Sequence, residues 1–438
     1  MAAETDTRPR QAPHWLFGAV LVLLAVAPGQ LAYAVDRKHG PFIAYADLLA
    51  AVVIAVWGLW VVLTGRLRQV VWPPRHTWAL LVVAVLSGLG AESLKLALLE
   101  VIQLGLYFVL AYMLFADVLR DVRRQRTALL VLLAATSVII AYGLAQYLRA
   151  LHPGEVTATF QSRSAYSAYL VMVLPLFYGL LLRSARLWER LWAGAALIIG
   201  ALTILSPLLV FVLVLVLGSV TLAWGRRSSL PLFVAGAGAF CVLTMLWAPL
   251  NRAVWRETLN PYEEGGDVYK LMDSGATDVK PGQVYVKKRW IEWMPALNMM
   301  AENFLLGVGT GNYQLNIGRP EYYGFLPNVK KSEPDTNNLY LVTGSSMGFA
   351  GLVCLLGFVG YFARRALTLG TRLASPDGWA LGAGLFGLAL AVPLANVFSS
   401  LFVRGTSLVW AFGYAMIVVL GESRRVPAGA SDTSLEAS

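Results

Sequence analysis

Residues 42–64 read FIAYADLLAAVVIAVWGLWVVLT, an apolar run with Asp47 as its one charged residue. A run of about 20 apolar residues is long enough to cross the hydrocarbon core of a bilayer as an α-helix. In that core each backbone amide and carbonyl needs a hydrogen-bond partner, and a helix supplies these partners from its own segment. The stretch therefore predicts a membrane-spanning helix.

Similar runs recur along the 438 residues of the chain. Hydrophobic residues make up 58% of it and charged residues 14%, whereas soluble domains carry about 25% charged residues. This composition excludes an ordinary soluble domain and predicts an all-α polytopic integral membrane protein. We expect about twelve transmembrane helices, near residues 15–34, 42–64, 77–90, 96–115, 127–148, 164–182, 191–204, 206–224, 230–250, 345–362, 379–398 and 408–420.

Because of two regions, the expected number of spans has a range of about two on either side. The third apolar run is short, and Ser206 and Pro207 interrupt one long apolar stretch. Two separate spans or a re-entrant hairpin would both fit this interruption.

Arginine predicts the orientation of the helices, because basic residues that flank membrane spans stay on the cytoplasmic side. With both termini in the cytoplasm, residues 251–344 form one large outer loop. The arginines that orient the helices account for much of the net charge of +10, so this charge does not indicate a nucleic-acid partner. The cytoplasmic loops are then all rich in arginine: residues 65–76, 116–126, 183–190, 225–229 and 363–372.

Four regions follow from this pattern. Residues 1–250 hold about nine spans, and residues 251–344 form the outer loop with short helices of its own. Residues 345–420 hold about three spans. Residues 421–438 are small and polar, which predicts a disordered cytoplasmic tail.

The second half of the outer loop contains a predicted amphipathic helix, whereas its first half, rich in glycine and acidic residues, predicts irregular structure. We expect the helix to lie along the membrane face, with Pro295 in its first turn or at a kink, and to end at Gly307. The glycines of GVGTGN, residues 307–312, would make a tight turn or let the backbone approach a ligand. The apolar residues of the helix are spaced three and four apart: Trp290, Trp293, Met294, Leu297 and Met300.

Basic residues on the outer side form a candidate phosphate-binding group. Lys287, Lys288 and Arg289 precede or begin the predicted helix, and Arg163 lies at a span boundary. A guanidinium group can donate two parallel hydrogen bonds to phosphate. The alternatives are a solvated or headgroup-contacting face for the lysines and snorkelling to the interface for Arg163.

Polar residues also gather where the tenth span begins, in EPDTNNLYLVTG, residues 333–344. Asp335 is the first candidate for a general base or for a group that orients an acceptor hydroxyl, because a carboxylate accepts a proton. The alternative is that SEPDT, residues 332–336, only caps the helix that follows. The sequence shows no cluster with metal-ligand spacing, so we expect no metal ion or other cofactor.

Three segments resemble the bacterial O-antigen ligase and O-antigen polymerase superfamily. TATFQSRSAYSAYLVMVLPL, residues 157–176, is similar to the family's polar outer turn before a proline-containing helix. KKRWIEWMPALNMMAENFLLGVGTGNY, residues 287–313, is similar to its loop pattern of Arg, Trp four residues later, a short helix and Gly-x-Gly. NNLYLVTGSSMGFAGLV, residues 337–353, resembles its His-Asn-x-Tyr-Leu motif. The order of many spans, one late outer loop and a few final spans also agrees.

The resemblance implies a GT-C-like glycosyltransferase of the bacterial inner membrane that acts on the periplasmic face. Its donor would be an undecaprenyl-diphosphate-linked oligosaccharide, and its acceptor a hydroxyl of a glycan or of lipid A core. Arg289 would engage the pyrophosphate with Trp293 beside it, and Arg163 would be the arginine of the outer turn. Asn338 and Tyr340 would be the Asn and Tyr of the family motif.

One position departs from the family, because Asn337 stands where the motif has histidine. An amide has no group that accepts a proton near neutral pH. If a base is needed, Asp335 or Glu333 would have to supply it. The departure favours an O-antigen or exopolysaccharide polymerase, with ligase as the alternative.

Two other classes of protein also fit many apolar helices. A flippase for lipid-linked sugars predicts ionisable residues deep within spans, for which Asp47, Glu92, Glu100 and Asp117 are the candidates. A structural subunit of an envelope complex predicts that Arg289 and Arg163 are replaceable without loss of product.

Overall fold

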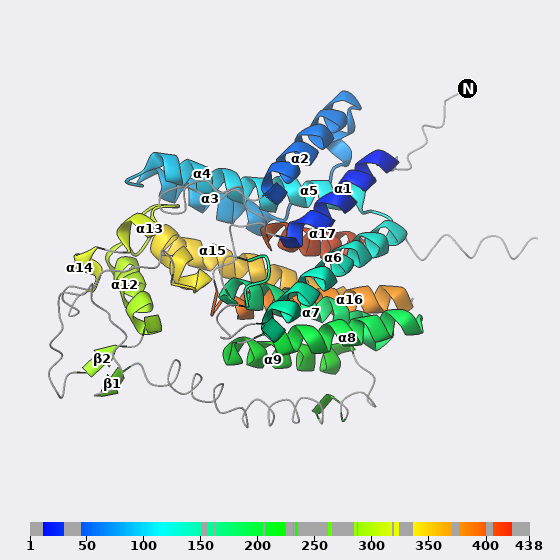
Figure 1. The fold of residues 1–438 in the computed structure, drawn as a ribbon. Coiled ribbons are helices and arrows are strands. Elements are labelled where there is room, and N and C mark those ends of the chain that lie inside the picture. Colours follow the sequence, from blue (N-terminus) through cyan, green and yellow to red (C-terminus); the bar gives the residue numbers. More distant parts are fainter. Residues whose placement is uncertain are drawn as a thin grey trace, which may run out of the picture.

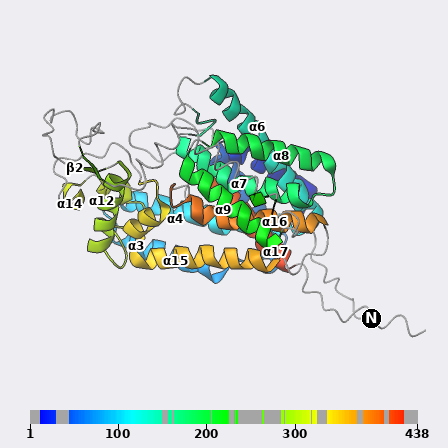
Figure 2. The same ribbon diagram turned by 90° about the horizontal axis from the view of Figure 1, so that it is seen from below.

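The protein is a bundle of α-helices (Figures 1 and 2). The computed structural model describes residues 12–29, 45–149, 156–160, 163–204, 206–224, 231, 233–234, 262–264, 284–286, 288–317, 319–323, 336–369, 376–399 and 406–422. Most of the ninth expected span and nearly all of the expected tail lie outside these residues.

Each of the other expected spans corresponds to helical structure. The fourth is one continuous run of three helical segments, α4, η3 and α5, and the tenth begins earlier than expected, at Leu339. The helices are α1 (His14–Val26), α2 (Tyr45–Leu63), α3 (Arg75–Leu89), α4 (Leu94–Gly105), η3 (Leu106–Ala111), α5 (Tyr112–Val118), α6 (Val122–Arg149), α7 (Arg163–Arg183), α8 (Leu187–Thr203), α9 (Pro207–Trp224), α15 (Leu339–Leu369), α16 (Pro376–Ala395) and α17 (Thr406–Glu422), with the short turns η1 (Ala27–Gly29) and η2 (Arg66–Gln69).

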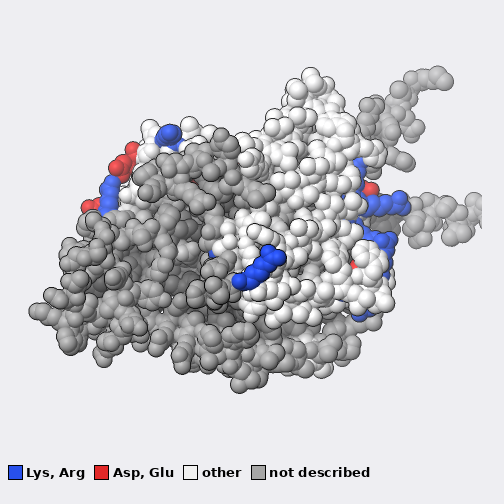
Figure 3. Space-filling view, viewed as in Figure 1, with Lys and Arg blue, Asp and Glu red and all other residues white. Residues whose placement is uncertain are grey.

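Six of the described helices have the length and composition of membrane spans, and four shorter ones are also apolar. On the face shown in Figure 3, most described charged side chains lie toward the two ends of the molecule, and a further basic group lies near its middle. The predicted helical fold is confirmed, and the apolar helices support a membrane-embedded protein, whereas the number of twelve spans stays a prediction. Six described helices are long and apolar enough to cross a membrane: Tyr45–Leu63, Leu94–Val118, Val122–Arg149, Arg163–Leu182, Leu339–Leu369 and Gly378–Ala395.

The interruption at Ser206 and Pro207 is a helix boundary. α8 ends at Thr203 and α9 begins at Pro207, and proline is well suited to the first turn of a helix because it has no amide hydrogen to leave unpaired. α8 packs on α6 and α7, whereas α9 packs on α7 and α16. The long apolar stretch therefore forms two helices with different neighbours.

α7 and α16 pack against each other in the middle of the bundle through small residues. A Cβ atom added to Gly179 would lie 2.4 Å from the carbonyl oxygen of Ala380, and one added to Gly387 would lie 2.5 Å from the Cβ atom of Pro175. Small residues allow such close approach of membrane helices. Later residues of α7 meet earlier residues of α16, so the two helices are antiparallel. The start of α7 therefore lies at the same end of the bundle as the end of α16.

Asp47, the one charge in residues 42–64, is paired with a side chain of a neighbouring helix. The hydroxyl of Tyr107, in the π-helical segment η3, donates a hydrogen bond to its carboxylate. An ionisable group in a span is costly without a partner. This bond gives Asp47 a structural role in holding α2 against η3.

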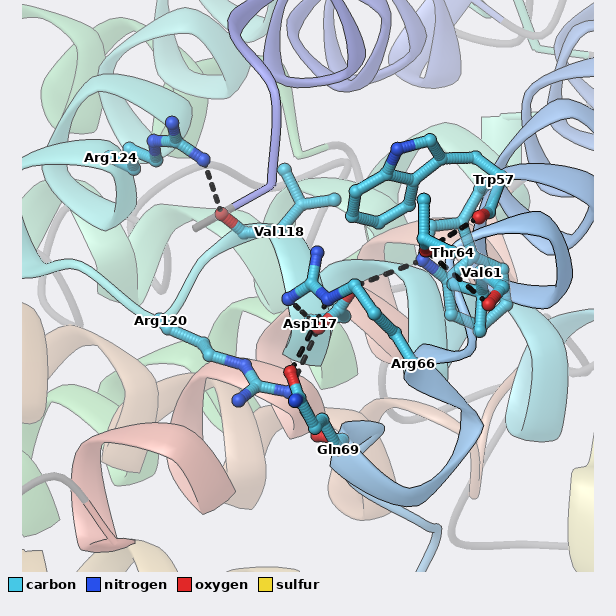
Figure 4. A network of polar contacts seen from close by, with 10 residues as sticks. Trp57, Val61, Thr64, Arg66, Gln69, Asp117, Val118, Arg120 and Arg124 are labelled. Carbon is cyan, nitrogen blue, oxygen red and sulfur yellow. Dashed lines mark hydrogen bonds and ion pairs between the residues drawn. The ribbon is translucent and has the colours of Figure 1, made fainter. Parts of the chain in front are cut away.

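A buried ion-pair network lies at the arginine-rich end of α2 and α5 (Figure 4). Asp117 accepts hydrogen bonds from Trp57 Nε1 at 3.2 Å and from Arg120 at 2.8 Å, and Arg66 lies 3.7 Å away. The side chains of Asp117 and Arg66 are only 1% and 7% exposed. Burial lowers the pKa of the Arg66 guanidinium, and the nearby Asp117 carboxylate opposes that shift.

Residues 251–344, the expected outer loop, contain short helices, as expected, and also a small β-ribbon. The helices are α12 (Lys288–Glu302), α13 (Tyr313–Asn316) and α14 (Pro320–Tyr323). Strands β1 (Tyr262–Glu264) and β2 (Val284–Val286) pair antiparallel, with Tyr262 opposite Val286. The expectation of irregular structure throughout the first half of the loop is thus wrong for β1. Each strand has three residues, too few to show an alternating pattern.

Candidate functional site

Segments far apart in the chain meet where α15 begins. The indole Nε1 of Trp293, in α12, donates a hydrogen bond to the carbonyl oxygen of Thr336 at 3.3 Å. The amide of Leu339 donates to the carbonyl oxygens of Asn396 and Ser399, at 2.9 and 3.0 Å, just beyond α16. α12, the start of α15 and the end of α16 therefore come together. The hydroxyl of Ser345 also donates to the carbonyl oxygen of Ala296, which joins the segments of residues 287–313 and 337–353 directly.

Asn338 caps α15. Its side-chain oxygen accepts hydrogen bonds from the amides of Tyr340 and Leu341, at 3.0 and 3.1 Å. These amides belong to the first turn, whose amides have no carbonyl partner within the helix. Asparagine is one of the preferred residues at this position because its side-chain oxygen can accept their hydrogen bonds. The cap is therefore Asn338, which is buried and lies just after the SEPDT segment that was expected to cap the helix.

Asn337 has a backbone conformation that few residues adopt. Its φ angle of 50° lies in the left-handed region, where asparagine, aspartate and histidine are enriched among the residues with a Cβ atom. Its side chain is half-buried. The conformation explains why a short polar residue stands immediately before the cap.

Tyr340 ties α15 to α16. Its hydroxyl donates a hydrogen bond to the carbonyl oxygen of Pro393 at 2.9 Å. Pro393 lies in the last turn of α16, where carbonyl groups have no amide partner further along the helix. The bond satisfies one of these groups and fixes the mutual position of the two helices.

Arg163 is the first residue of α7, and its side chain is half-buried. Because α7 and α16 are antiparallel, this arginine lies at the end of the bundle where α15 begins. The preceding turn is held by Gln146, whose side-chain oxygen accepts from the amides of Thr157 and Ala158 at 3.1 and 2.7 Å. A positive charge at the start of a helix is unfavourable for the helix dipole, so helix stability alone does not account for an arginine here.

Several predicted site residues are not described. Glu333, Asp335 and Lys287 lie outside the described residues, as do the side chains of Lys288 and Arg289. The backbone of Lys288 and Arg289 forms the first turn of α12, one turn before Trp293. Their proposed roles therefore stay predictions.

The three glycines of residues 307–312 adopt conformations that favour glycine. Gly307, Gly309 and Gly311 have φ angles of 70°, 105° and 74°. A Cβ atom on Gly307 would lie 2.4 Å from the carbonyl oxygen of Ser345, and one on Gly309 would lie 2.5 Å from Ala91. The glycines therefore form the tight turn that was one of their two interpretations. The backbone of this turn lies close to the backbone of α15 and to Ala91.

α15 is broken at Gly348, a feature that the sequence analysis missed. This residue has φ 65° and ψ −165° inside the helix. The amides of Phe349 and Ala350 donate outside the helix, to the carbonyl oxygens of Phe304 and Leu305 at 2.7 and 3.2 Å. In return, the carbonyl oxygens of Ser345 and Ser346 accept from the amides of Val308 and Gly309. The turn after α12 thus supplies the hydrogen bonds that the break would otherwise leave unmade.

Ser87 of α3 joins the same junction. Its hydroxyl contacts the carbonyl oxygens of Leu306 and Ser346, both at 2.8 Å, and accepts from the amide of Thr310 at 3.0 Å. Ser345 similarly donates to the carbonyl oxygen of Ala296 in α12, at 2.8 Å. A glycine and adjacent serines within an apolar helical pattern were the available sequence signal for the break.

The buried face of α12 is turned toward α15. Ala296 and Met299 are fully buried, and α12 packs on α15 and α14. Pro295 lies inside the helix, which ends at Glu302 and continues as a turn to Gly307 and beyond. The helix was predicted, but its most buried residues lie beside the expected stripe, of which Leu297 is exposed. Trp293 and Met300 of that stripe contact the segment just before the cap of α15 and the start of α15, respectively.

Charged residues surround the outer turns. Arg319 forms an ion pair with Glu92, at the turn between α3 and α4. The pKa of the Tyr322 hydroxyl is raised, first by burial and then by the nearby carboxylates of Glu302 and Glu321. In the part of the chain that the structure describes, no three His, Cys, Asp or Glu residues lie together as metal ligands.

Comparison of the sequence with models of protein families and with curated proteins gave no match.

Proposed function

We propose that the protein is a glycosyltransferase of the bacterial inner membrane, which transfers a glycan from an undecaprenyl-diphosphate-linked donor to an acceptor hydroxyl on the periplasmic face. The observation that supports this most is the hydrogen bond between Trp293 and Thr336. It joins the loop helix that begins with Lys288 and Arg289 to the Asn337–Asn338–Tyr340 segment. These are the two segments whose resemblance to the O-antigen ligase and polymerase superfamily is most specific.

The proposed topology has twelve spans, with residues 251–344 as the periplasmic loop. The buried network of Arg66, Arg120 and Asp117 lies in two of the arginine-rich loops assigned to the cytoplasm. Arg163 and the start of α15 lie at helix ends assigned to the opposite side. This separation supports the orientation.

In the proposed reaction, Arg289 and Arg163, with Lys287 and Lys288, neutralise the diphosphate of the donor. The acceptor oxygen forms a bond to the anomeric carbon, and the bond from that carbon to the phosphate oxygen breaks. The carrier diphosphate leaves with the electron pair, and Asp335, or Glu333, takes the proton of the acceptor hydroxyl. Positioning and charge stabilisation by fixed groups supply the catalysis.

Polymerisation of repeat units is the preferred activity, and ligation of the finished glycan to lipid A core is the second candidate. The family motif has histidine where this chain has Asn337, and its backbone conformation accepts either residue. A flippase is less favoured because Asp47 and Asp117, two of its candidate ionisable residues, have hydrogen-bond partners in neighbouring elements.

The glycan profile of a strain that lacks the gene tests the proposal. The strain would carry the wild-type protein, Arg289→Ala or Asp335→Ala, with Arg68→Ala as a matched control, because Arg68 is exposed in the loop assigned to the cytoplasm. Protein levels in the membrane are measured for each variant. Single lipid-linked repeats without polymer indicate a polymerase, and long carrier-linked chains beside bare lipid A core indicate a ligase. A normal profile from both Arg289→Ala and Asp335→Ala would overturn the proposed site.

A further inference from the structure

The turn that follows α12 exposes an apolar tip. Phe304 and Leu305 are 57% and 65% exposed, and Leu306 is also exposed. The ring of Phe304 stacks on Phe349 of α15, with ring centroids 5.2 Å apart and an angle of 12° between the planes. Phe349 is itself exposed. Four large apolar side chains therefore lie together on the outside of the molecule, and we call them the apolar tip.

The apolar tip continues the exposed surfaces of two apolar helices. On α15, Val353 and Leu356 are exposed after Phe349, four and then three residues further on, so that all three share one face. On α3, Leu86 and Leu89 are exposed on either side of the junction residue Ser87. α15 belongs to the helices long and apolar enough to cross a membrane. The surface that such a helix exposes is the surface that lipid covers.

The position of Phe349 along α15 places the tip at the depth of acyl chains. Arg364 and Arg365 lie near the opposite end of this helix. At 1.5 Å per residue, about 22 Å of helix separates Phe349 from Arg364, which is less than the roughly 30 Å thickness of the hydrocarbon core. The exposed Glu302 comes directly before the turn. The chain thus passes from a charged residue to the apolar tip within a few positions.

Irregular backbone is tolerated at this depth only where its polar groups have partners. The carbonyl oxygens of Phe304, Leu305 and Leu306 accept from the amide of Phe349, the amide of Ala350 and the hydroxyl of Ser87. The amides of Gly307, Val308 and Gly309 donate to the carbonyl oxygens of Asn303, Ser345 and Ser346. These six backbone groups of the turn therefore have partners, and residues next to the break at Gly348 supply four of them.

We infer that residues 303–309 form a re-entrant turn in the outer leaflet, whose apolar tip contacts lipid acyl chains and anchors the outer loop to the bilayer. The break in α15 is then the docking site for this turn. The inference concerns how the loop is held, and it does not depend on the proposed transfer of a glycan.

Spin labels in lipid nanodiscs test the inference. In a background with Cys241→Ala and Cys354→Ala, single labels are placed by Leu305→Cys, with Val353→Cys as the lipid-facing control and Glu302→Cys as the aqueous control. Collision with dissolved oxygen and with a water-soluble nickel chelate is measured for each label. We expect the label at 305 to favour oxygen over nickel by about the same factor as the label at 353, and the label at 302 to show the reverse preference.

Two results would overturn the inference. A label at 305 as accessible to nickel as the label at 302 would place the tip in water. An immobilised label reached by neither reagent would mean that protein covers the tip, such as a second copy of this chain. Leu306→Cys gives an independent reading of the same turn if the label at 305 prevents folding, and each variant is checked by size-exclusion chromatography.

Discussion

The indole nitrogen of Trp293 donates to the carbonyl oxygen of Thr336 across a separation of 43 positions in the chain. Thr336 lies one residue before Asn337 and two before the cap residue Asn338. This bond from α12 and the bonds made by the amide of Leu339 thus hold the backbone on either side of Asn337 and Asn338. The distance between the two proposed halves of the site depends on this contact.

Replacement of Trp293 by phenylalanine removes the donor but keeps an aromatic ring. We expect the rate of glycan transfer to fall about fivefold, because a hydrogen bond of this kind contributes about 1 kcal/mol. The rate is measured in membranes with equal amounts of each protein. Trp188→Phe is the matched control, since Trp188 is an exposed residue of α8. Equal rates for the two variants would contradict the role of the bond.

Gly348→Ala should destabilise the protein severely. A Cβ atom here would lie 2.3 Å from the carbonyl carbon of Leu305, and the φ angle of 65° is itself strained for alanine. We expect a loss of at least about 3 kcal/mol, the size typical of a mutation that combines strain with a clash. The midpoint of thermal unfolding in detergent reports it.

Gly360→Ala is the control in the same helix, because a Cβ atom there would meet nothing within 4 Å. Alanine is favoured over glycine in a helix by about 1 kcal/mol, so this variant should be as stable as the wild type or more so. Similar midpoints for Gly348→Ala and Gly360→Ala would show that α15 is not broken as described.

Asn338→Ala tests the cap of α15. The side-chain oxygen that accepts from Tyr340 and Leu341 is lost, and loss of such a cap costs about 1 kcal/mol. Asn338→Asp keeps an acceptor oxygen and should retain most of the stability. If both variants unfold at the wild-type midpoint, the cap contributes nothing measurable. Loss of transfer in Asn338→Asp at full stability would point instead to a role in binding substrate.

Asp117→Asn should destabilise the arginine-rich end of the bundle. The change removes the charge that compensates Arg66, which is 7% exposed, and breaking a buried ion pair costs about 3–5 kcal/mol. Asp121→Asn, in the same loop but more exposed, is the control. The concentration of denaturant at half-unfolding is compared for the two variants. Equal concentrations for the two variants would show that the network contributes little to the free energy of unfolding.

The helices were predictable because the backbone amides and carbonyls of each apolar run need hydrogen-bond partners within the run. The boundary between α8 and α9 was predictable for a similar local reason, since Pro207 suits a first turn and not a helix interior. The start of α15 at Leu339 was missed, because the cap by Asn338 extends the helix through Tyr340 and Thr343, which are more polar than the span that follows.

The junction at Gly348 could not be predicted from local pattern. Its stability depends on carbonyl groups of residues 304–306 and on Ser87, which is far away in sequence. A helical pattern that contains Gly348 is compatible with an unbroken helix until those partners are known. The candidate site has the same character: the sequence indicated the Trp293 and Asn338 segments, and only the fold shows that they touch.

The network around Asp117 has a consequence for the order of events during biosynthesis. Its partners Trp57 and Arg66 leave the ribosome before it, and Arg120 follows immediately. When α5 enters the membrane, the acidic group can therefore be neutralised at once, while the C-terminal half of the chain is still being translated. Chains in general assemble from the N-terminus as they are made. The first helices of this protein can therefore neutralise their buried charge before the C-terminal half has been made.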